Sequence, residues 1–420
     1  MVVGGCSARR SALFFGLVFA LIAAQACNTG SVDTANTHRP EIRASGEDIL
    51  RIVSSFPAKG QLAGQSALMQ QAIDLAIEER GGRAGHWRVE HVRLDGGSTD
   101  DGSWSARQER ANATAAVNDP AVIAYIGPYN SGAARFSLPI TNRAHLLQLS
   151  PTMTWPGLTE QGWEAGEPDA YYPTGRRTFA RLMPSDAWQA EVAARRAGEL
   201  GARKAFVLRD GSTYSDGLAR RFALAARSHG LEVVGEADIT HTRGTELAGQ
   251  VRQSRADVVF YAPSTTGNAV MAARALADVP LSTGVFASDT ALSDQFMEAA
   301  GDSAPRWWVV YNGFVPPLAT DEWRQFEQAF MRRYAVTPSQ FAANAYDLTN
   351  LVLDALERID VPDRRQVSEL VLGTRGYAGV TGIITFTPEG DVHNWRMSVY
   401  RLAADRAVFD RLLEGGATTP

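Results

Sequence analysis

Two stretches in the first half of the chain combine hydroxyl groups with free backbone donors, which together can hold a small charged ligand. Residues 127–132 read Gly-Pro-Tyr-Asn-Ser-Gly, and a helix is expected to begin at Ser131. The free N–H groups of a first helical turn and a serine hydroxyl suit a carboxylate, although Ser131 could equally be a helix cap. Tyr129 and Asn130 precede it as further candidates. The sequence therefore predicts an anion site here.

The second stretch, residues 150–154, reads Ser-Pro-Thr-Met-Thr. Thr152 and Thr154 are two residues apart and point to one side of an extended chain, where nearby carbonyl groups can accept from an ammonium group. An ordinary polar turn after Pro151 is the alternative interpretation.

Three more polar segments in the second half of the chain each follow an apolar run. Tyr214 could cover a ligand with its ring, Asp289 could be a counter-ion for a ligand cation, and Ser264 offers a hydroxyl. Each could instead be a cap or a surface group. Their common position after apolar runs favours a shared site for a small ligand.

Short apolar runs that alternate with helical patterns must position these residues. A helical pattern is clear where Met69, Ile73 and Ile77 share one face, and Gly81-Gly82 ends it. Runs that are apolar throughout predict strands covered on both faces, as in parallel sheets. The expected strands are residues 49–53, 89–94, 122–126, 146–149, 205–208, 231–234, 258–261, 285–286 and 307–310, with two long helices ending near residue 358.

The alternation occurs twice, with a break at about residues 154–181, so we predict an α/β fold with two doubly wound parallel-sheet lobes. Ligands bind beyond the carboxyl ends of such strands, where the polar segments lie. Facing lobes would then share one small ligand.

Composition excludes several functions. The chain has 420 residues and 46 acidic against 41 basic side chains, a net charge of −5, so nucleic acid is not an expected partner. The seven histidines are dispersed, with no His-x-x-x-His pair, cysteine cluster or Gly-x-Ser-x-Gly elbow. We therefore expect no metal, no cofactor and no enzymatic activity; a secreted hydrolase is the remote alternative.

The N-terminus has the pattern of an export signal. Arg9 and Arg10 precede an apolar run at residues 12–24, which is too short to span a bilayer. Cys27 follows at the position where bacterial lipoprotein precursors carry their acylated cysteine; ordinary cleavage after Ala26 is the alternative. We expect a signal peptide at 1–26 and a flexible lipoprotein tether at 27–47, which places the mature protein outside the cytoplasm.

The chain resembles the type I periplasmic binding proteins, specifically the leucine/isoleucine/valine-binding branch that serves ABC importers. The resemblance covers roughly residues 48–405. It rests on the order and spacing of residues 56–60, 125–131, 149–154, 210–217 with Tyr214, 341–348 with Tyr346-Asp347, and 379–386.

The resemblance implies a role for each candidate. Ser131 would bind a ligand carboxylate, and Thr152 and Thr154 would share carboxylate and ammonium contacts. Tyr214 would close over the ligand, and Asp289 would hold the ammonium group, at a position where relatives often have glutamate. Ser264 stands where amino-acid binders can carry tyrosine.

The resemblance also implies a hinge of three chain crossings, expected near residues 177–183, 306–312 and 380–384. Lobe I would comprise residues 48–178 and 311–380, and lobe II residues 179–310 and 381–410. The implied function is a solute-binding lipoprotein that captures an amino acid, branched-chain-like, or a small amide by lobe closure and delivers it to ABC permease subunits. A ligand-sensing subunit of a membrane receptor is the alternative, and the role of the loop at 161–177 stays open.

Overall fold

The computed structural model describes residues 49–98, 103–313, 320–404 and 406–415. The expected signal peptide, Cys27 and the tether lie outside the described residues. None of the helices in the described part of the chain is long and apolar enough to cross a membrane.

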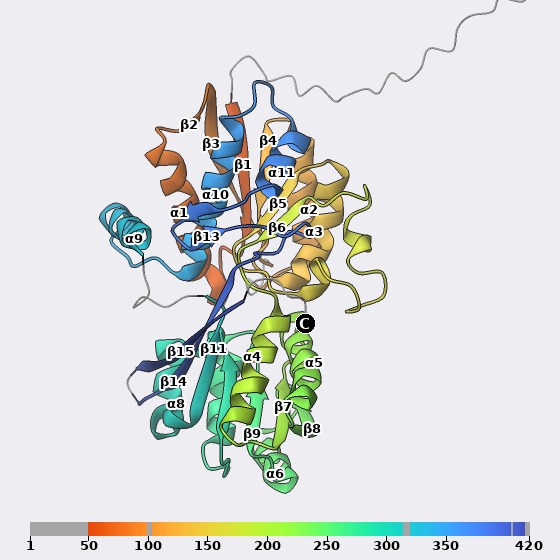
Figure 1. The fold of residues 1–420 in the computed structure, drawn as a ribbon, viewed down its shortest axis with the longest axis vertical. Coiled ribbons are helices and arrows are strands. Elements are labelled where there is room, and N and C mark those ends of the chain that lie inside the picture. The colour runs from red at the N-terminus through yellow and green to blue at the C-terminus, as the bar shows by residue number, and fades with distance from the viewer. Residues whose placement is uncertain (1–48, 99–102, 314–319, 405, 416–420) are drawn as a thin grey trace, which may run out of the picture. The chain divides into compact units, whose positions relative to one another are not determined.

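The first of two large sheets has six strands in the order β2-β3-β1-β4-β5-β6 (Figure 1). Only the short β2 runs antiparallel to its neighbour β3; the other pairs are parallel. The strands are β1 (Ile49–Phe56), β2 (Arg83–Ala84), β3 (Trp87–Asp95), β4 (Val122–Ile126), β5 (Leu147–Ser150) and β6 (Phe179–Arg181).

Helices cover both faces of this sheet because successive strand residues point to opposite sides. Ile52 of β1 packs in a core with the first group of helices, whereas its neighbour Val53 packs toward the second group. The first group is α1 (Ala63–Glu79), α9 (Asp321–Tyr334), α10 (Gln340–Leu356) and α11 (Arg364–Leu372), and the second is α2 (Ala106–Asn118) and α3 (Ser131–Arg143).

The second sheet has seven described strands in the order β15-β14-β11-β10-β9-β7-β8. Its two C-terminal strands pair antiparallel, and the remaining pairs are parallel. The strands are β7 (Lys204–Arg209), β8 (Glu232–Asp238), β9 (Val258–Tyr261), β10 (Gly284–Ser288), β11 (Trp307–Tyr311), β14 (Trp395–Leu402) and β15 (Ala407–Gly415).

Helices again lie on both faces of the second sheet, since Val259 and Phe260 of β9 belong to two different cores. One core includes α6 (Gly244–Ser254), α7 (Thr266–Leu276) and α8 (Asp294–Ala300), and the other includes α4 (Asp186–Glu199) and α5 (Thr213–Ser228). The predicted class, two doubly wound α/β lobes, is confirmed.

Three connections join the sheets: β6 to α4, β11 to α9, and the hairpin of β12 (Tyr377–Gly379) and β13 (Gly382–Ile384) to β14. β6 pairs with β5, and Ile384 packs in a core of the first lobe. The chain therefore leaves the first lobe a few residues later than the boundaries expected at 178 and 380. The antiparallel pair β14–β15 was not predicted.

Candidate functional site

The hydroxyl groups of the first lobe come together where β4 and β5 end. Gly127 after β4 has φ +133°, and a Cβ there would lie 2.7 Å from the carbonyl oxygen of Ser55, so only glycine fits. Ser131 is the first residue of α3, after Asn130 as the cap, and its hydroxyl accepts from the backbone N–H groups of Thr154 and Trp155, both at 3.3 Å. The alternative interpretation of Ser131 as the helix cap is therefore wrong, because Asn130 occupies that position. The Ser131 hydroxyl instead joins the loop after β4 to the loop after β5, and its role as an anion site stays a prediction.

Thr152 makes a second link between the same loops. Its hydroxyl donates to the carbonyl of Tyr129 at 2.7 Å, while Ser150 accepts from the N–H groups of Thr152 and Met153. Thr152 is 9% exposed and Thr154 is 4% exposed. The structure thus brings Tyr129, Ser131, Thr152 and Thr154 together in one preorganised polar corner.

Asp289 and Tyr214 of the second lobe are also in contact. The Tyr214 hydroxyl, on the first turn of α5, donates to Oδ1 of Asp289 at 3.3 Å, and Nε2 of Gln189 donates to the same oxygen at 3.3 Å. Burial raises the pKa of Asp289, and these two hydrogen bonds oppose that shift only in part. Both partners are neutral, so the carboxylate has no compensating cation among them.

The Asp289 carboxylate also acts electrostatically on Tyr129 of the first lobe. Burial and the Asp289 carboxylate together raise the pKa of Tyr129, and the same two causes raise the pKa of Tyr311 at the end of β11. Burial and Asp289 also raise the pKa of Tyr214. Tyr214 thus contacts the Asp289 carboxylate directly, and the charge of that carboxylate also raises the pKa of Tyr129 and Tyr311.

Ser264 belongs to a different cluster. Its backbone N–H donates to Oδ2 of Asp210 at 2.8 Å, and Asn268 and Tyr261 donate to the same oxygen. Asp210 therefore fixes the loop between β9 and α7. Asn130 is half-buried, and its Oδ1 is a buried acceptor without a partner in the described part of the chain.

Asp186 is a group that sequence reasoning missed. It is the first residue of α4 and is fully buried, and its N–H donates to the Thr154 carbonyl at 2.9 Å, which joins the two lobes. Burial raises its pKa to about 8, against the opposing effects of Thr154 and Arg181, and Asp289 adds to the rise. The sequence signal that could have identified Asp186 is the Ser-Asp pair at the start of a helix after an apolar run.

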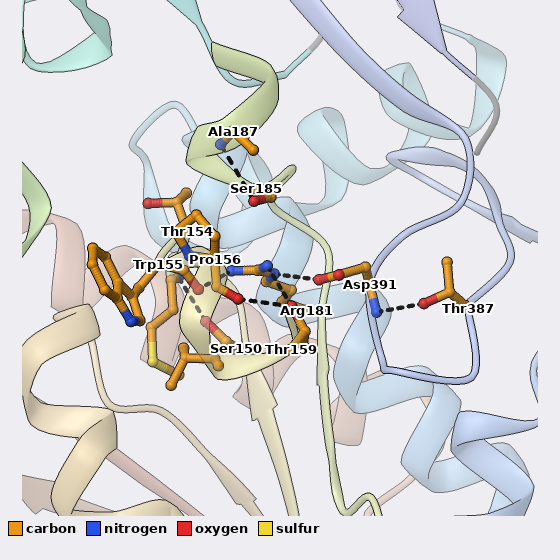
Figure 2. A network of polar contacts seen from close by, with 12 residues as sticks. Ser150, Thr154, Trp155, Pro156, Thr159, Arg181, Ser185, Ala187, Thr387 and Asp391 are labelled. Atoms are coloured by element: carbon orange, nitrogen blue, oxygen red, sulfur yellow. Dashed lines mark hydrogen bonds and ion pairs between the residues drawn. The ribbon is translucent and has the colours of Figure 1, made fainter. Parts of the chain in front are cut away.

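Arg181 at the end of β6 is the second missed residue, and Figure 2 shows its contacts. Its fully buried guanidinium donates to the Trp155 carbonyl at 2.7 Å, to the Thr159 hydroxyl at 2.8 Å and to Asp391 at 2.6 Å. Burial lowers its pKa, but the carboxylates of Asp391 and Glu160 raise it overall. Arg181 thus connects the first and third hinge segments to the Thr154–Trp155 loop.

The loop after β5 also contacts the second lobe. Trp155 is fully buried, and a Cβ on Gly217 of α5 would collide with its ring. Arg220 of α5 lies over the same ring, 5.5 Å from its centroid, and donates to Glu164 at 3.4 Å. We call Trp155, Glu164, Gly217 and Arg220 the rim contact.

Comparison with known proteins places the chain in a family. Residues 50–407 match the family model described as "Periplasmic binding protein". The Leu/Ile/Val-binding protein BraC3 of Rhizobium johnstonii is 21% identical over 359 residues, which cover 84% of this chain and 91% of that protein.

Two solved structures share the fold. The leucine-binding protein LivK from Thermotoga maritima has a TM-score of 0.74 at 21% identity and covers 87% of this chain and 98% of its own. A solute-binding protein of an ABC transporter from R. palustris, solved with benzoate, has a TM-score of 0.72 at 16% identity, covering 88% and 97%. The resemblance to the leucine/isoleucine/valine branch is thereby confirmed, and the chain belongs to the periplasmic binding protein family.

Proposed function

We propose that this protein is the extracytoplasmic solute-binding component of an ABC importer and that it captures an amino acid, branched-chain-like, or a small amide by closing its two lobes. Family membership and the names of its relatives support this class of function. Binding, with no chemical step, is the proposed activity.

The observation that carries the proposal is the half-buried Asp289 carboxylate, whose hydrogen-bond partners Gln189 and Tyr214 are both neutral. An α-ammonium group would supply the missing positive charge. The carboxylate of the same ligand would lie in the polar corner of the first lobe, at the Ser131 hydroxyl and the first-turn N–H groups of α3. A ligand with both groups therefore contacts both lobes and stabilises their closure.

This arrangement favours an amino acid over an aromatic acid. Benzoate, the ligand in the R. palustris structure, carries a negative charge and no positive one. Its carboxylate would repel the Asp289 carboxylate, and benzoate has no cationic group to offset that repulsion. A neutral amide would donate its N–H groups to the same carboxylate.

Isothermal titration calorimetry on the purified protein tests the proposal with leucine, isoleucine, valine, asparagine, acetamide and benzoate. We expect at least one of the amino acids or acetamide to bind, and no heat from benzoate. Binding of benzoate alone would contradict the role given to Asp289.

We further propose that Cys27 is acylated and tethers the mature protein to the outer face of the cell membrane, beside its permease partner. The sequence pattern around Cys27 supports this. Cys27→Ser should move the protein from the membrane fraction to the soluble fraction of exporting cells. An unchanged distribution would contradict the proposal that Cys27 carries the lipid anchor.

A further inference from the structure

Asp186 begins α4 directly after the first connection and lies where the two lobes meet. It is 0% exposed, and its backbone N–H donates to the Thr154 carbonyl of the first lobe at 2.9 Å. Neither oxygen of its carboxyl group has a hydrogen-bond partner in the described part of the chain. An ionised carboxylate that is buried without partners is very costly, so such a group takes up a proton instead.

The first turn of α4 does not supply the missing partners. A helix N-terminus stabilises a carboxylate through its free N–H groups. Here the N–H of Ala187 donates to the Ser185 hydroxyl at 3.3 Å, and the N–H of Trp188 donates to the Ser185 carbonyl at 3.0 Å. Since the N–H of Asp186 itself bonds to Thr154, all three donors are already used.

The charged surroundings of Asp186 also oppose its ionisation. Burial raises the pKa of Asp186 to about 8, against the opposing effects of the Thr154 side chain and Arg181. The guanidinium of Arg181 is already paired with another carboxylate at 2.6 Å. The titratable and charged groups that act on Asp186 from both lobes are Glu160, Arg181, Tyr214 and Asp289.

Asp186 and Asp289 form a pair of acids with different surroundings. Asp289 accepts hydrogen bonds from Gln189 and Tyr214, both at 3.3 Å, and these bonds favour its charged form. Asp186 has no such donors in the described part of the chain, so a proton shared by the pair belongs on Asp186. Acids whose surroundings separate them in this way can differ in charge at one pH.

We propose that Asp186 holds a proton between the lobes near neutral pH and that it gives up this proton when the ammonium group of a ligand binds beside Asp289. The ligand cation offsets the repulsion from Asp289, so the ionised form of Asp186 becomes more stable. The O–H bond of the carboxyl group breaks, and the proton passes to the buffer. The release rests on the proposed function, whereas the proton on Asp186 does not.

Calorimetry with leucine in two buffers of different ionisation enthalpy measures how many protons leave on binding. At pH 7.5 the wild type should release about 0.2 proton or more per bound leucine. Binding that releases protons becomes tighter as the pH rises, so the affinity should increase at least about two-fold between pH 6 and pH 8. This measurement needs no variant, and leucine binding without any release would overturn the proposal.

Asp186→Asn keeps a neutral side chain of the same shape but cannot ionise. It should abolish the release and flatten the pH dependence of leucine affinity. Asp302→Asn, at an exposed position of the second lobe, is the matched control and should release as many protons as the wild type. Equal release by Asp186→Asn and the wild type would assign the proton to another group and overturn the proposal.

Infrared spectroscopy of the ligand-free protein tests the proton on Asp186 without leucine. The difference spectrum between the wild type and Asp186→Asn at pH 7 should contain the carbonyl band of a protonated carboxyl group. This band should disappear as the pH rises above about 8. A carboxylate band in its place at pH 7 would contradict the proposal. If leucine does not bind, the ligand assignment and the release both fail, while the infrared result still decides whether Asp186 holds a proton.

Discussion

At the scale of single residues, Asp289 is the proposed contact of the positively charged group of the ligand. Asp289→Asn keeps the shape and the hydrogen bonds to Gln189 and Tyr214 but removes the negative charge. Affinity for an α-ammonium ligand should fall at least ten-fold, which corresponds to ~1.4 kcal/mol, when measured by calorimetry near pH 7. Asp302→Asn, at an exposed position of the same lobe, is the matched control and should bind as the wild type does. Equal ligand affinity in both variants would show that Asp289 does not contact the ligand.

Glu109 is a second buried acid, away from the candidate site. It is fully buried, accepts from Ser55 and Tyr125 at 2.8 Å each, and burial raises its pKa from 4.5 to about 7. An acid whose pKa is raised on folding contributes its full stability only below its unfolded pKa of about 4.5. That contribution is lost as the pH rises through about 7.

Glu109→Gln should therefore make stability less sensitive to pH. Between pH 4.5 and pH 8 the wild type should lose ~3 kcal/mol relative to the variant, at about 1.36 kcal/mol per pKa unit. Urea unfolding at several pH values measures this difference, and Glu232→Gln, at an exposed position, is the control. A constant gap between Glu109→Gln and the wild type across this range would show that Glu109 does not titrate there.

At the scale of elements, the rim contact joins the loop after β5 to α5. Gly217→Ala adds a methyl group against the Trp155 ring, so α5 must move away from the first lobe. We expect ligand affinity to fall at least three-fold, because the contacts formed on closure include this surface.

Gly249→Ala is a close control, since Gly249 lies inside α6 of the same lobe and a Cβ there meets nothing within 4 Å. It should leave affinity unchanged and stabilise the protein by about 0.5–1 kcal/mol, as alanine does in a helix. If Gly217→Ala binds ligand as tightly as Gly249→Ala, the rim contact plays no part in closure.

Most of the elements could be predicted from the sequence because buried parallel strands are apolar throughout. The runs at 122–126 and 258–261 coincide with β4 and β9, and both long helices before residue 358 are present. β14 and β15 could not be predicted, since Trp395–Leu402 mixes arginine with apolar residues and pairs antiparallel with both β11 and the edge strand β15.

The candidate site could be predicted only in part. Strand ends identified Ser131, Thr152, Tyr214 and Asp289, because parallel strands bring their carboxyl ends to one edge. Asp186 was not predicted, since its bond to Thr154 depends on how α4 meets the other lobe and not on local pattern. Gln189 was not predicted either, since it lies inside α4 and reaches Asp289 only through the packing of α4 on the second sheet.

At the scale of the whole molecule, three connections join two lobes with separate cores and are the proposed hinge. The bond between Thr154 and Asp186 and the rim contact join the two lobes, and the bond between Arg181 and Asp391 joins two of the connections. A ligand that binds Ser131 on one side and Asp289 on the other would add its own contacts to these and shift the population toward the closed state.

Small-angle X-ray scattering of the protein with and without saturating ligand measures whether the lobes close on binding. We expect the radius of gyration to decrease when the amino acid or amide identified by calorimetry is added. Asp289→Asn should require a higher ligand concentration for the same decrease. A radius of gyration that does not change at saturation would contradict capture by lobe closure.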